Sequence, residues 1–299
     1  NSVLKVRLCH CEIHTAYFEA KNETTNLPIV LIHGFGTGVA YWAPNIQGLT
    51  EKYSVYCFDM PGFGQSSRPQ FSQDETLAEL EMVSAFEDWR KEMQIEKFYL
   101  IAHSFGAFFA ASYALEHPHR VEHIILVDPW GFPEKPILTE KQIDPQLYMH
   151  AISYIISYFN PLSLIRLCGT YGSWVLRKLR PDVGKKFGKD GRVNDDIYEY
   201  IALCNRQDPS GERLYKTLTN RSGFAKRPMC LRFGSLDESV RATFIYGGKT
   251  FIDPGPALDM QYQKGNTVDV QILRGAGHLV NVDVVRDFNL AILALISKE

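Results

Sequence analysis

A single serine stands between small residues where two apolar segments meet. Residues 98–111 read FYLIAHSFGAFFAA, which predicts an apolar strand that turns at once into an apolar helix. Such a turn places the Ser104 hydroxyl over a helix N-terminus, where backbone N–H groups and the helix dipole favour negative charge. This is the pattern of a nucleophile elbow, with Ala102 where a glycine is usual. We therefore expect Ser104 to act as a nucleophile.

A serine hydroxyl is a poor nucleophile near neutral pH and needs a general base within hydrogen-bond reach. The best candidate is His278, because it ends the run RGAGH at 274–278, just beyond the last expected strand. The two glycines before it allow a tight loop that brings the imidazole over the edge of a sheet. We expect His278 to be the base.

The base must in turn be oriented by an acid that follows the serine in the chain. We favour Asp253, which lies beyond the expected strand at 241–247, directly before the final strand. Asp128 ends an earlier strand and is an alternative. Asp237, in the run FGSLD, is a second alternative, but it precedes the strand at 241–247.

The negative oxygen of a tetrahedral intermediate needs preorganised N–H donors. The run HGFG at 33–36 follows an expected strand, and its glycines let the backbone approach the serine. We expect the N–H groups of Phe35 and Phe105 to form this oxyanion hole. Substrate contacts are expected from four further residues, namely Gly34, His103, Trp130 and His150.

A glycine-rich loop at 59–66 reads DMPGFGQS and resembles a phosphate-binding loop only superficially. A P-loop requires a lysine after its glycines, and none follows here. We interpret the loop as a turn that shapes the wall of the site.

The surrounding elements alternate between strands and helices. Apolar runs typical of strands occur at 3–8, 11–20, 28–33, 53–59, 98–102, 123–128, 241–247 and 267–273, and helical patterns at 41–52, 75–93, 105–116 and 283–296. This alternation indicates an α/β fold with a mostly parallel central sheet flanked by helices. From about 133 to 226 the pattern is helical only, which indicates a cap inserted before the last two core strands. We therefore divide the chain into core residues 1–132, a helical cap or lid at 133–226, and core residues 227–299.

Composition narrows the class of partner. The 299 residues are 45% hydrophobic and 22% charged, with a formal net charge of −2, so no basic field exists to hold a nucleic acid. Six cysteines lack disulfide or zinc spacing, which is typical of a reduced, cytoplasmic protein. No secretory signal is recognisable at the start. We expect neither a metal nor another cofactor.

The expected cap carries two features that suit lipids. Residues 145–165 have no formal charge and are rich in Tyr, Ile and Leu, but Asn160 and Pro161 make a membrane span unfavourable. Residues 177–192 contain seven cations and two aspartates. Apolar helices beside a basic segment are typical of a surface that meets anionic headgroups, although a solvated loop explains the charges equally well.

Taken together, these segments resemble the α/β-hydrolase superfamily. The runs LVDPWGFP at 126–133, FGQSSRP at 63–69 and HLVNVD at 278–283 are similar to a narrower abhydrolase branch. That branch contains N-acyl-phosphatidylethanolamine lipase and the coactivator of adipose triglyceride lipase that is mutated in Chanarin–Dorfman syndrome. The similarity covers nearly the whole chain and is weakest in the cap.

The resemblance implies a lipid-directed function and favours Asp253 as the acid. Coactivator members carry asparagine at the elbow, so Ser104 places this chain with the lipases. In the branch, the pattern His278-x4-Asp283 has been linked to acyl transfer to lysophosphatidic acid. We instead expect Asp283 to stabilise the start of the final helix.

The resulting hypothesis is a serine hydrolase that cleaves acyl esters of phospholipids, lysophospholipids or N-acyl phospholipids. The alternatives are a lipid-surface regulator that activates a partner lipase and a coenzyme-A-dependent lysophosphatidic acid acyltransferase. The expected location is cytoplasmic, at the surface of membranes or lipid droplets.

Overall fold

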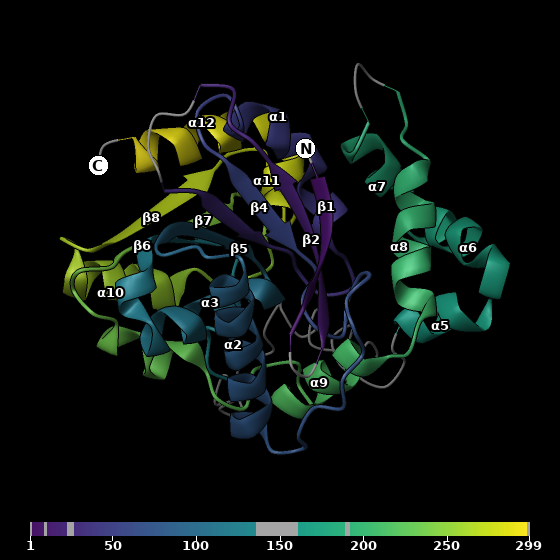
Figure 1. Ribbon diagram of the computed structural model, residues 1–299, viewed down its shortest axis with the longest axis horizontal. Coiled ribbons are helices and arrows are strands. Elements are labelled where there is room, and N and C mark those ends of the chain that lie inside the picture. Colours follow the sequence, from purple (N-terminus) through teal and green to yellow (C-terminus); the bar gives the residue numbers. More distant parts are fainter. Residues whose placement is uncertain (1, 9–10, 23–26, 136–160, 189–191, 298–299) are drawn as a thin grey trace, which may run out of the picture.

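The order of strands in the central sheet determines where the candidate residues meet. The computed structural model describes residues 2–8, 11–22, 27–135, 161–188 and 192–297. Within them one sheet has the strand order β1-β2-β4-β3-β5-β6-β7-β8 (Figure 1). β2 pairs antiparallel with β1 and β4, and all other neighbours are parallel. The strands are β1 (Ser2–Arg7), β2 (Glu12–Phe18), β3 (Ile29–Ile32), β4 (Val55–Phe58), β5 (Phe98–His103), β6 (Val121–Val127), β7 (Arg241–Gly247) and β8 (Val268–Leu273).

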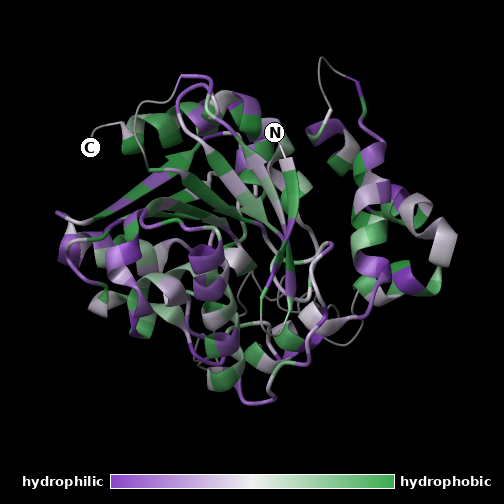
Figure 2. Ribbon diagram, viewed as in Figure 1, coloured by the Kyte–Doolittle hydropathy of each residue, from purple (hydrophilic) through white to green (hydrophobic). Residues whose placement is uncertain are grey.

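The central strands are apolar on both faces because helices cover both faces. Every residue of β3 and β5 is buried, as expected for parallel strands in the middle of a sheet. In Figure 2 these strands are mainly hydrophobic, whereas the helices around them mix hydrophobic and hydrophilic residues. The expectation of a mostly parallel sheet flanked by helices is confirmed.

Two hydrophobic layers attach the helices to the sheet. One layer includes side chains of α2, α3, α9 (Ser210–Leu218) and α10, and the other includes side chains of α1, α11 and α12. The core helices are α1 (Ala43–Leu49), α2 (Glu75–Glu92), α3 (Phe105–Glu116), α10 (Gly255–Lys264), α11 (Val280–Asp283) and α12 (Val285–Ile296). Among them, α2 begins where its sequence predicts, because the Asp74 carboxylate accepts hydrogen bonds from Thr76 N and Leu77 N, both at 2.9 Å.

Further helices occur between β6 and β7. They are α5 (Pro161–Leu167), α6 (Gly172–Leu179), α7 (Pro181–Lys186), α8 (Asp196–Arg206) and α9 (Ser210–Leu218). Figure 1 shows α5 to α8 grouped beside the sheet. Their position in the chain is compatible with the division into core residues 1–132, cap 133–226 and core residues 227–299, which we keep as a proposal. Most of the apolar segment 145–165, including His150, lies outside the described residues.

Candidate active site

Ser104 occupies a sharp turn between β5 and α3, as its sequence context predicts. Its φ of 51° and ψ of −116° are rare for a residue other than glycine, so the backbone is strained here. Two hydrogen bonds hold the turn: Ser104 N donates to Val127 O at 3.0 Å, and Trp130 N donates to Ser104 O at 3.2 Å. The serine is thereby fixed at the carboxyl end of the sheet, where open α/β sheets bind ligands.

Two glycines allow the elements around Ser104 to approach one another. A Cβ atom on Gly106 would lie 2.2 Å from His33 O, and one on Gly34 would lie 2.7 Å from His103 Nδ1. Neither contact is sterically acceptable, so α3 and the turn after β3 require residues without a side chain at these positions. The same Cβ atom on Gly34 would lie 3.3 Å from Ser104 Cβ, so this turn runs directly beside the serine.

His278 reaches Ser104 from the loop after β8. Its Nε2 lies 3.0 Å from Ser104 Oγ, the distance at which an imidazole can accept the hydroxyl proton. The tight loop that the sequence predicts is present, with Gly275 at a φ of +87° that only glycine adopts readily. The structure therefore brings the expected nucleophile and base together.

Asp128 is the acid that contacts His278. Its Oδ2 lies 2.5 Å from His278 Nδ1, and its side chain is fully buried. Asp128 directly follows β6 and has a φ of 45°, which turns the carboxylate toward the histidine. Gly247 N and Thr250 Oγ1 also donate to it, at 3.3 and 2.5 Å. These donors satisfy the buried carboxylate and hold it in one orientation.

Our expectation that Asp253 orients His278 is wrong in this geometry. The Asp253 side chain is exposed and accepts a hydrogen bond from Gly255 N at 2.9 Å, where α10 begins. Asp237 is also exposed and accepts hydrogen bonds from Ser239.

The reason lies in the loop after β7, which supports the histidine loop and contributes no acid to it. Lys249 N donates to Ala276 O at 2.8 Å, and Gly248 N donates to Leu273 O at 2.9 Å. These bonds tie the first residues of the loop to the chain before His278. The loop then continues past the histidine, so that Asp253 arrives at the start of α10.

His103 lies behind the site, which contradicts its expected contact with substrate. It is 3% exposed, stacks on Tyr41 with ring centroids 4.7 Å apart, and has Nε2 2.9 Å from His278 O. Burial, together with the nearby His278 and His33, lowers the pKa of His103 well below its ordinary value. The neutral ring donates from Nε2 to the His278 carbonyl oxygen and so supports the histidine loop from the buried side.

A buried network of amides extends this support, and nothing in the sequence signalled it. Tyr41 Oη donates to Asn281 Oδ1 at 2.6 Å, just beyond His278 in the chain. Asn45 Nδ2 in turn donates to Asn281 O and to Asn289 Oδ1, at 2.9 and 3.0 Å. These bonds fix α11, which follows the histidine loop, against α1 and α12.

An aromatic wall lies next to the serine turn. Trp130 packs against Phe105 and against Tyr215 of α9, with ring centroids 5.4 and 5.2 Å apart. Phe35 packs against the same Tyr215 at 4.7 Å. Trp130 Nε1 donates to Gly223 O at 3.1 Å, which fixes the indole. Trp130 was expected near the substrate, whereas Tyr215 was missed because it stands in a helix without a recognisable motif.

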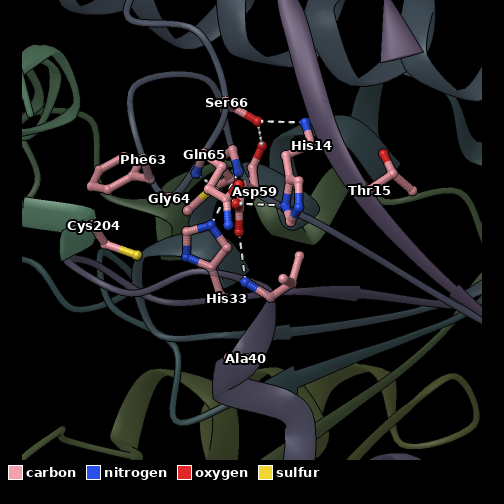
Figure 3. A network of polar contacts seen from close by, with 12 residues as sticks. His14, Thr15, His33, Ala40, Asp59, Phe63, Gly64, Gln65, Ser66 and Cys204 are labelled. Atoms are coloured by element: carbon pink, nitrogen blue, oxygen red, sulfur yellow. Dashed lines mark hydrogen bonds and ion pairs between the residues drawn. The ribbon is translucent and has the colours of Figure 1, made fainter. Parts of the chain in front are cut away.

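The glycine-rich loop at 59–66 is organised by its own acid. Figure 3 shows the buried Asp59 carboxylate at the centre of a polar network. It accepts hydrogen bonds from Val39 N at 2.6 Å and Gln65 N at 2.7 Å, and His14 Nδ1 lies 3.0 Å away. Because a carboxylate already occupies these donors, the loop is a structural turn, in agreement with our interpretation.

The helices between β6 and β7 contact the turn after β3, which carries Phe35, one of the two expected oxyanion donors. Asn205 Nδ2 of α8 donates to Gly36 O at 2.6 Å, and Ala40 N donates to Tyr200 Oη at 3.2 Å. Leu162 of α5 belongs to a small apolar cluster against which Phe35 packs. The position of this turn therefore depends on α5 and α8.

Asp283 braces the histidine loop, so our expectation that it stabilises the start of the last helix is not what the structure shows. Its Oδ2 accepts a hydrogen bond from Gly277 N at 2.7 Å, and its Oδ1 lies 2.7 Å from Lys186 Nζ of α7. The carboxylate thus joins α7 to the residue directly before His278.

Comparison with known proteins agrees with this architecture. Residues 28–283 match the family model described as alpha/beta hydrolase fold. Abhydrolase domain-containing protein lid-1 of Caenorhabditis elegans is 46% identical over 288 residues, which cover 95% of this chain and 79% of the relative. Human (lyso)-N-acylphosphatidylethanolamine lipase is 40% identical, covering 89% of this chain and 78% of the relative. The 1-acylglycerol-3-phosphate O-acyltransferase ABHD5 of Sus scrofa is 39% identical, covering 91% and 78%.

Solved structures show the same fold at low sequence identity. The crystal structure of a membrane phospholipase A, a bacterial virulence factor, has a TM-score of 0.73 at 20% identity and covers 99% of this chain and 86% of its own. The epoxide hydrolase CorEH has a TM-score of 0.72 at 15% identity and covers 99% of both chains. The fold, the sequence relatives and the family model agree: the chain belongs to the α/β-hydrolase fold family.

Proposed function

We propose that the protein is a serine hydrolase that cleaves acyl ester bonds of phospholipids, lysophospholipids or N-acyl phospholipids through an acyl-serine intermediate. One observation carries the proposal: Ser104 Oγ, both ring nitrogens of His278 and the Asp128 carboxylate form a continuous relay, with links of 3.0 and 2.5 Å. A serine, an imidazole and a buried acid in this order are the groups that acyl transfer requires.

In the first half-reaction, Ser104 Oγ attacks the ester carbonyl carbon while its proton moves to His278 Nε2. Asp128 accepts a hydrogen bond from Nδ1–H, which selects the tautomer whose Nε2 is free and stabilises the imidazolium that forms. We assign the oxyanion to the N–H groups of Phe35 and Phe105, on the turns after β3 and β5. Collapse of the intermediate breaks the ester C–O bond, and His278 returns the proton to the leaving alkoxide.

In the second half-reaction, water attacks the acyl-serine by the same route in reverse. His278 takes a proton from the water, the tetrahedral intermediate collapses, and the fatty acid leaves as Ser104 recovers its proton. Each half-reaction uses the same relay and the same oxyanion donors. The mechanism therefore requires no group beyond the side chains and N–H groups named above.

The lipid class rests on the relatives and on the aromatic wall. One relative is named a lipase of N-acylated phospholipids and another an acyltransferase of an acylglycerol phosphate. The half-buried rings of Trp130 and Tyr215, packed against Phe105, supply apolar surface beside Ser104 that suits an acyl chain. Within the described residues no helix is long and apolar enough to cross a membrane. We extend the proposal to a cytoplasmic protein that meets its substrate at the surface of membranes or lipid droplets.

Acyl transfer to lysophosphatidic acid is a second candidate, favoured by the name of the ABHD5 relatives. In this case the acyl group comes from a coenzyme A thioester, and a lipid hydroxyl takes the place of water in the second half-reaction. Asp283 binds Gly277 N and Lys186, so it supports the loop of His278 and does not form a separate acid–base pair. A third candidate, activation of a partner lipase at a lipid surface, does not need the relay.

A lipid-panel assay of the wild type and the Ser104→Ala variant separates the three candidates. We expect a fluorophosphonate probe to label the wild type, and the substitution to abolish both labelling and fatty-acid release. Ser235→Ala, a change at an exposed serine, is the matched control and should behave as the wild type. Release that persists in Ser104→Ala would exclude the hydrolase. Activation of a partner lipase that survives the substitution would support the regulator, and coenzyme-A-dependent lipid acylation that is lost with it would support the acyltransferase.

A further inference from the structure

The segment from α5 to α6 exposes large apolar side chains. Leu167 is 84% exposed, Tyr171 73% and Trp174 60%. Figure 1 shows these helices beside α8, on the side away from the sheet. Three such side chains close together on one short segment exceed the scattered single residues that are normal on a protein surface.

The inner side of the same helices is already packed, so this exposure is not a missing core contact. Leu162, Ile165 and Leu176 belong to or pack against a small apolar cluster with Ala202 of α8. The helices are thus held in place by one face while the other face is free among the described residues. The second apolar face is therefore a candidate binding surface.

The segment that carries the exposed face is rich in positive charge. Between residues 167 and 188 the chain has five cations and one acid, although its net charge is −2. Lys178 Nζ lies 5.9 Å from the centroid of the Trp174 ring, and its side chain is exposed. Lys185 is exposed as well, whereas the other three cations pair with acids: Arg177 with Asp195, Arg180 with Asp182 and Lys186 with Asp283.

We infer that Leu167, Tyr171, Trp174 and Lys178 form a docking face for the surface of an anionic phospholipid bilayer. Indole and phenol rings prefer the boundary between headgroups and acyl chains, and a lysine beside them places its ammonium among phosphates while its alkyl stem stays apolar. Leu167 at the same level adds buried apolar area, and the exposed ammonium groups of Lys178 and Lys185 attract anionic lipid.

The inference deepens the proposed lipid hydrolysis, on which it rests for its biological meaning, by naming where the enzyme meets its substrate surface. The helices that carry the docking face also contact the loops that position the catalytic residues. Leu162, on the packed side of α5, lies against the turn of Phe35 and Gly36. Lys186, on the helix after α6, binds the Asp283 brace of the His278 loop. Docking through α5 and α6 therefore involves the same segment of the chain that supports the turn of Phe35 and the His278 loop.

Trp174 is a built-in reporter for this face. The chain has four tryptophans, of which Trp42 and Trp89 are fully buried and Trp130 is half-buried. We would use the full chain carrying Ser104→Ala, so that lipid is not consumed, with phosphatidylcholine vesicles containing or lacking phosphatidylserine. Vesicles with phosphatidylserine should shift Trp174 emission to the blue, and brominated acyl chains should quench it. Sedimentation with the same vesicles gives the partition coefficient.

Leu167→Asp and Lys178→Glu should each lower partition onto phosphatidylserine vesicles at least about tenfold. Tyr262→Asp, a change at a residue that is 93% exposed on α10, is the matched control and should bind as the parent does. The inference is overturned if the parent protein does not sediment with these vesicles, or if the face variants bind equally well. A partner protein bound by the parent and lost in the face variants, without vesicle binding, would assign the face to a protein interface.

Failure of this inference differs from failure of the proposed function. With Ser104 restored, the face variants should hydrolyse a short-chain soluble ester at the wild-type rate and lose activity only on vesicles. Vesicle binding without any hydrolysis that depends on Ser104 would reject the proposed function and leave the docking face in place. If the face variants hydrolyse vesicle lipid as fast as the wild type, the docking face would be rejected and the proposed function would stand.

Discussion

Asp128 Oδ2 and His278 Nδ1 lie 2.5 Å apart although their strands, β6 and β8, are separated in the sheet by β7. The contact crosses the end of β7, where Gly247 has no side chain and so leaves space for the loop before His278. A Cβ atom at that position would lie 2.1 Å from Gly277 O. The amide of Gly247 and the hydroxyl of Thr250 donate to the same carboxylate, so the strand between acid and base holds the acid in place.

Asp128→Asn should lower kcat by roughly three to four orders of magnitude, because an amide in place of the carboxylate no longer selects the productive histidine tautomer. Asp253→Asn is the matched control, since that carboxylate caps an exposed turn, and it should keep most of the wild-type activity. Steady-state hydrolysis of one soluble ester by both variants measures the difference. Equal losses in the two variants would show that the acid is assigned wrongly.

Asp283→Ala should reduce kcat about tenfold with little change in KM, because the loop of His278 loses its bond from Gly277 N and its link to Lys186. Lys186→Met should produce a smaller effect in the same direction, since only one of the two contacts is lost. Asp287→Asn, a change at an exposed acid on α12, is the control. Asp283→Ala with wild-type kcat would show that the brace does not position the histidine.

Gly106→Ala should lower the free energy of unfolding by about 2–3 kcal/mol, because the added methyl group meets His33 O and Ile32 Cγ2 at 2.2 and 2.8 Å. Both atoms belong to β3 or its end, in the middle of the sheet, and cannot move aside easily. Gly234→Ala is the control, since a Cβ atom there has no neighbour within 4 Å. Urea unfolding followed by circular dichroism measures both. If the two variants were equally stable, tight packing at the elbow would not be the reason for the glycine.

His103 should make stability fall as the pH decreases below about 6.5. Burial holds its folded-state pKa well below the ordinary value, so in this range the unfolded chain binds a proton that the native protein does not. The native state therefore loses up to about 1.4 kcal/mol per pH unit through this residue as the pH falls.

The test compares unfolding free energies of the wild type and His103→Asn between pH 5 and 8. The variant should be less stable at pH 8, because the buried ring and its bond to His278 O are lost, and the gap should narrow toward pH 5. His119→Asn, at an exposed position, should leave the slope unchanged. A gap that stays constant with pH would mean that the pKa of His103 is the same in the native and the unfolded protein.

Much of the fold is predictable from hydrophobic patterning alone. All the described strands coincide with expected runs, because buried parallel strands such as β3 and β5 require continuous apolar sequence. The elbow at Ser104 and the loop at His278 are predictable for a similar reason: small residues and glycines are required at fixed places around them. By contrast, α10 was missed, since its pattern of apolar residues is weak and prolines stand at its start.

The acid was not predictable, because the sequence contains a carboxylate after both β6 and β7. The positive φ of Asp128 and the bonds between the loop after β7 and the chain before His278 decide between them, and neither is visible as a pattern. Contacts such as Asn45 to Asn281 and Lys186 to Asp283 join residues far apart in the chain. A single sequence carries no sign of such pairs.

The loop after β7 supports the acid through Thr250 but contributes no group to the proton relay, so its outer side chains can change substrate specificity. Phe251, on this loop, is exposed yet has its ring centroid 4.8 Å from that of His278. The side chain at position 251 can therefore be exchanged, by evolution or by an engineer, to reshape the rim over the imidazole, whereas Ile252 N donates to the Thr250 hydroxyl that holds Asp128. The catalytic groups would remain encoded on separate segments and survive each exchange.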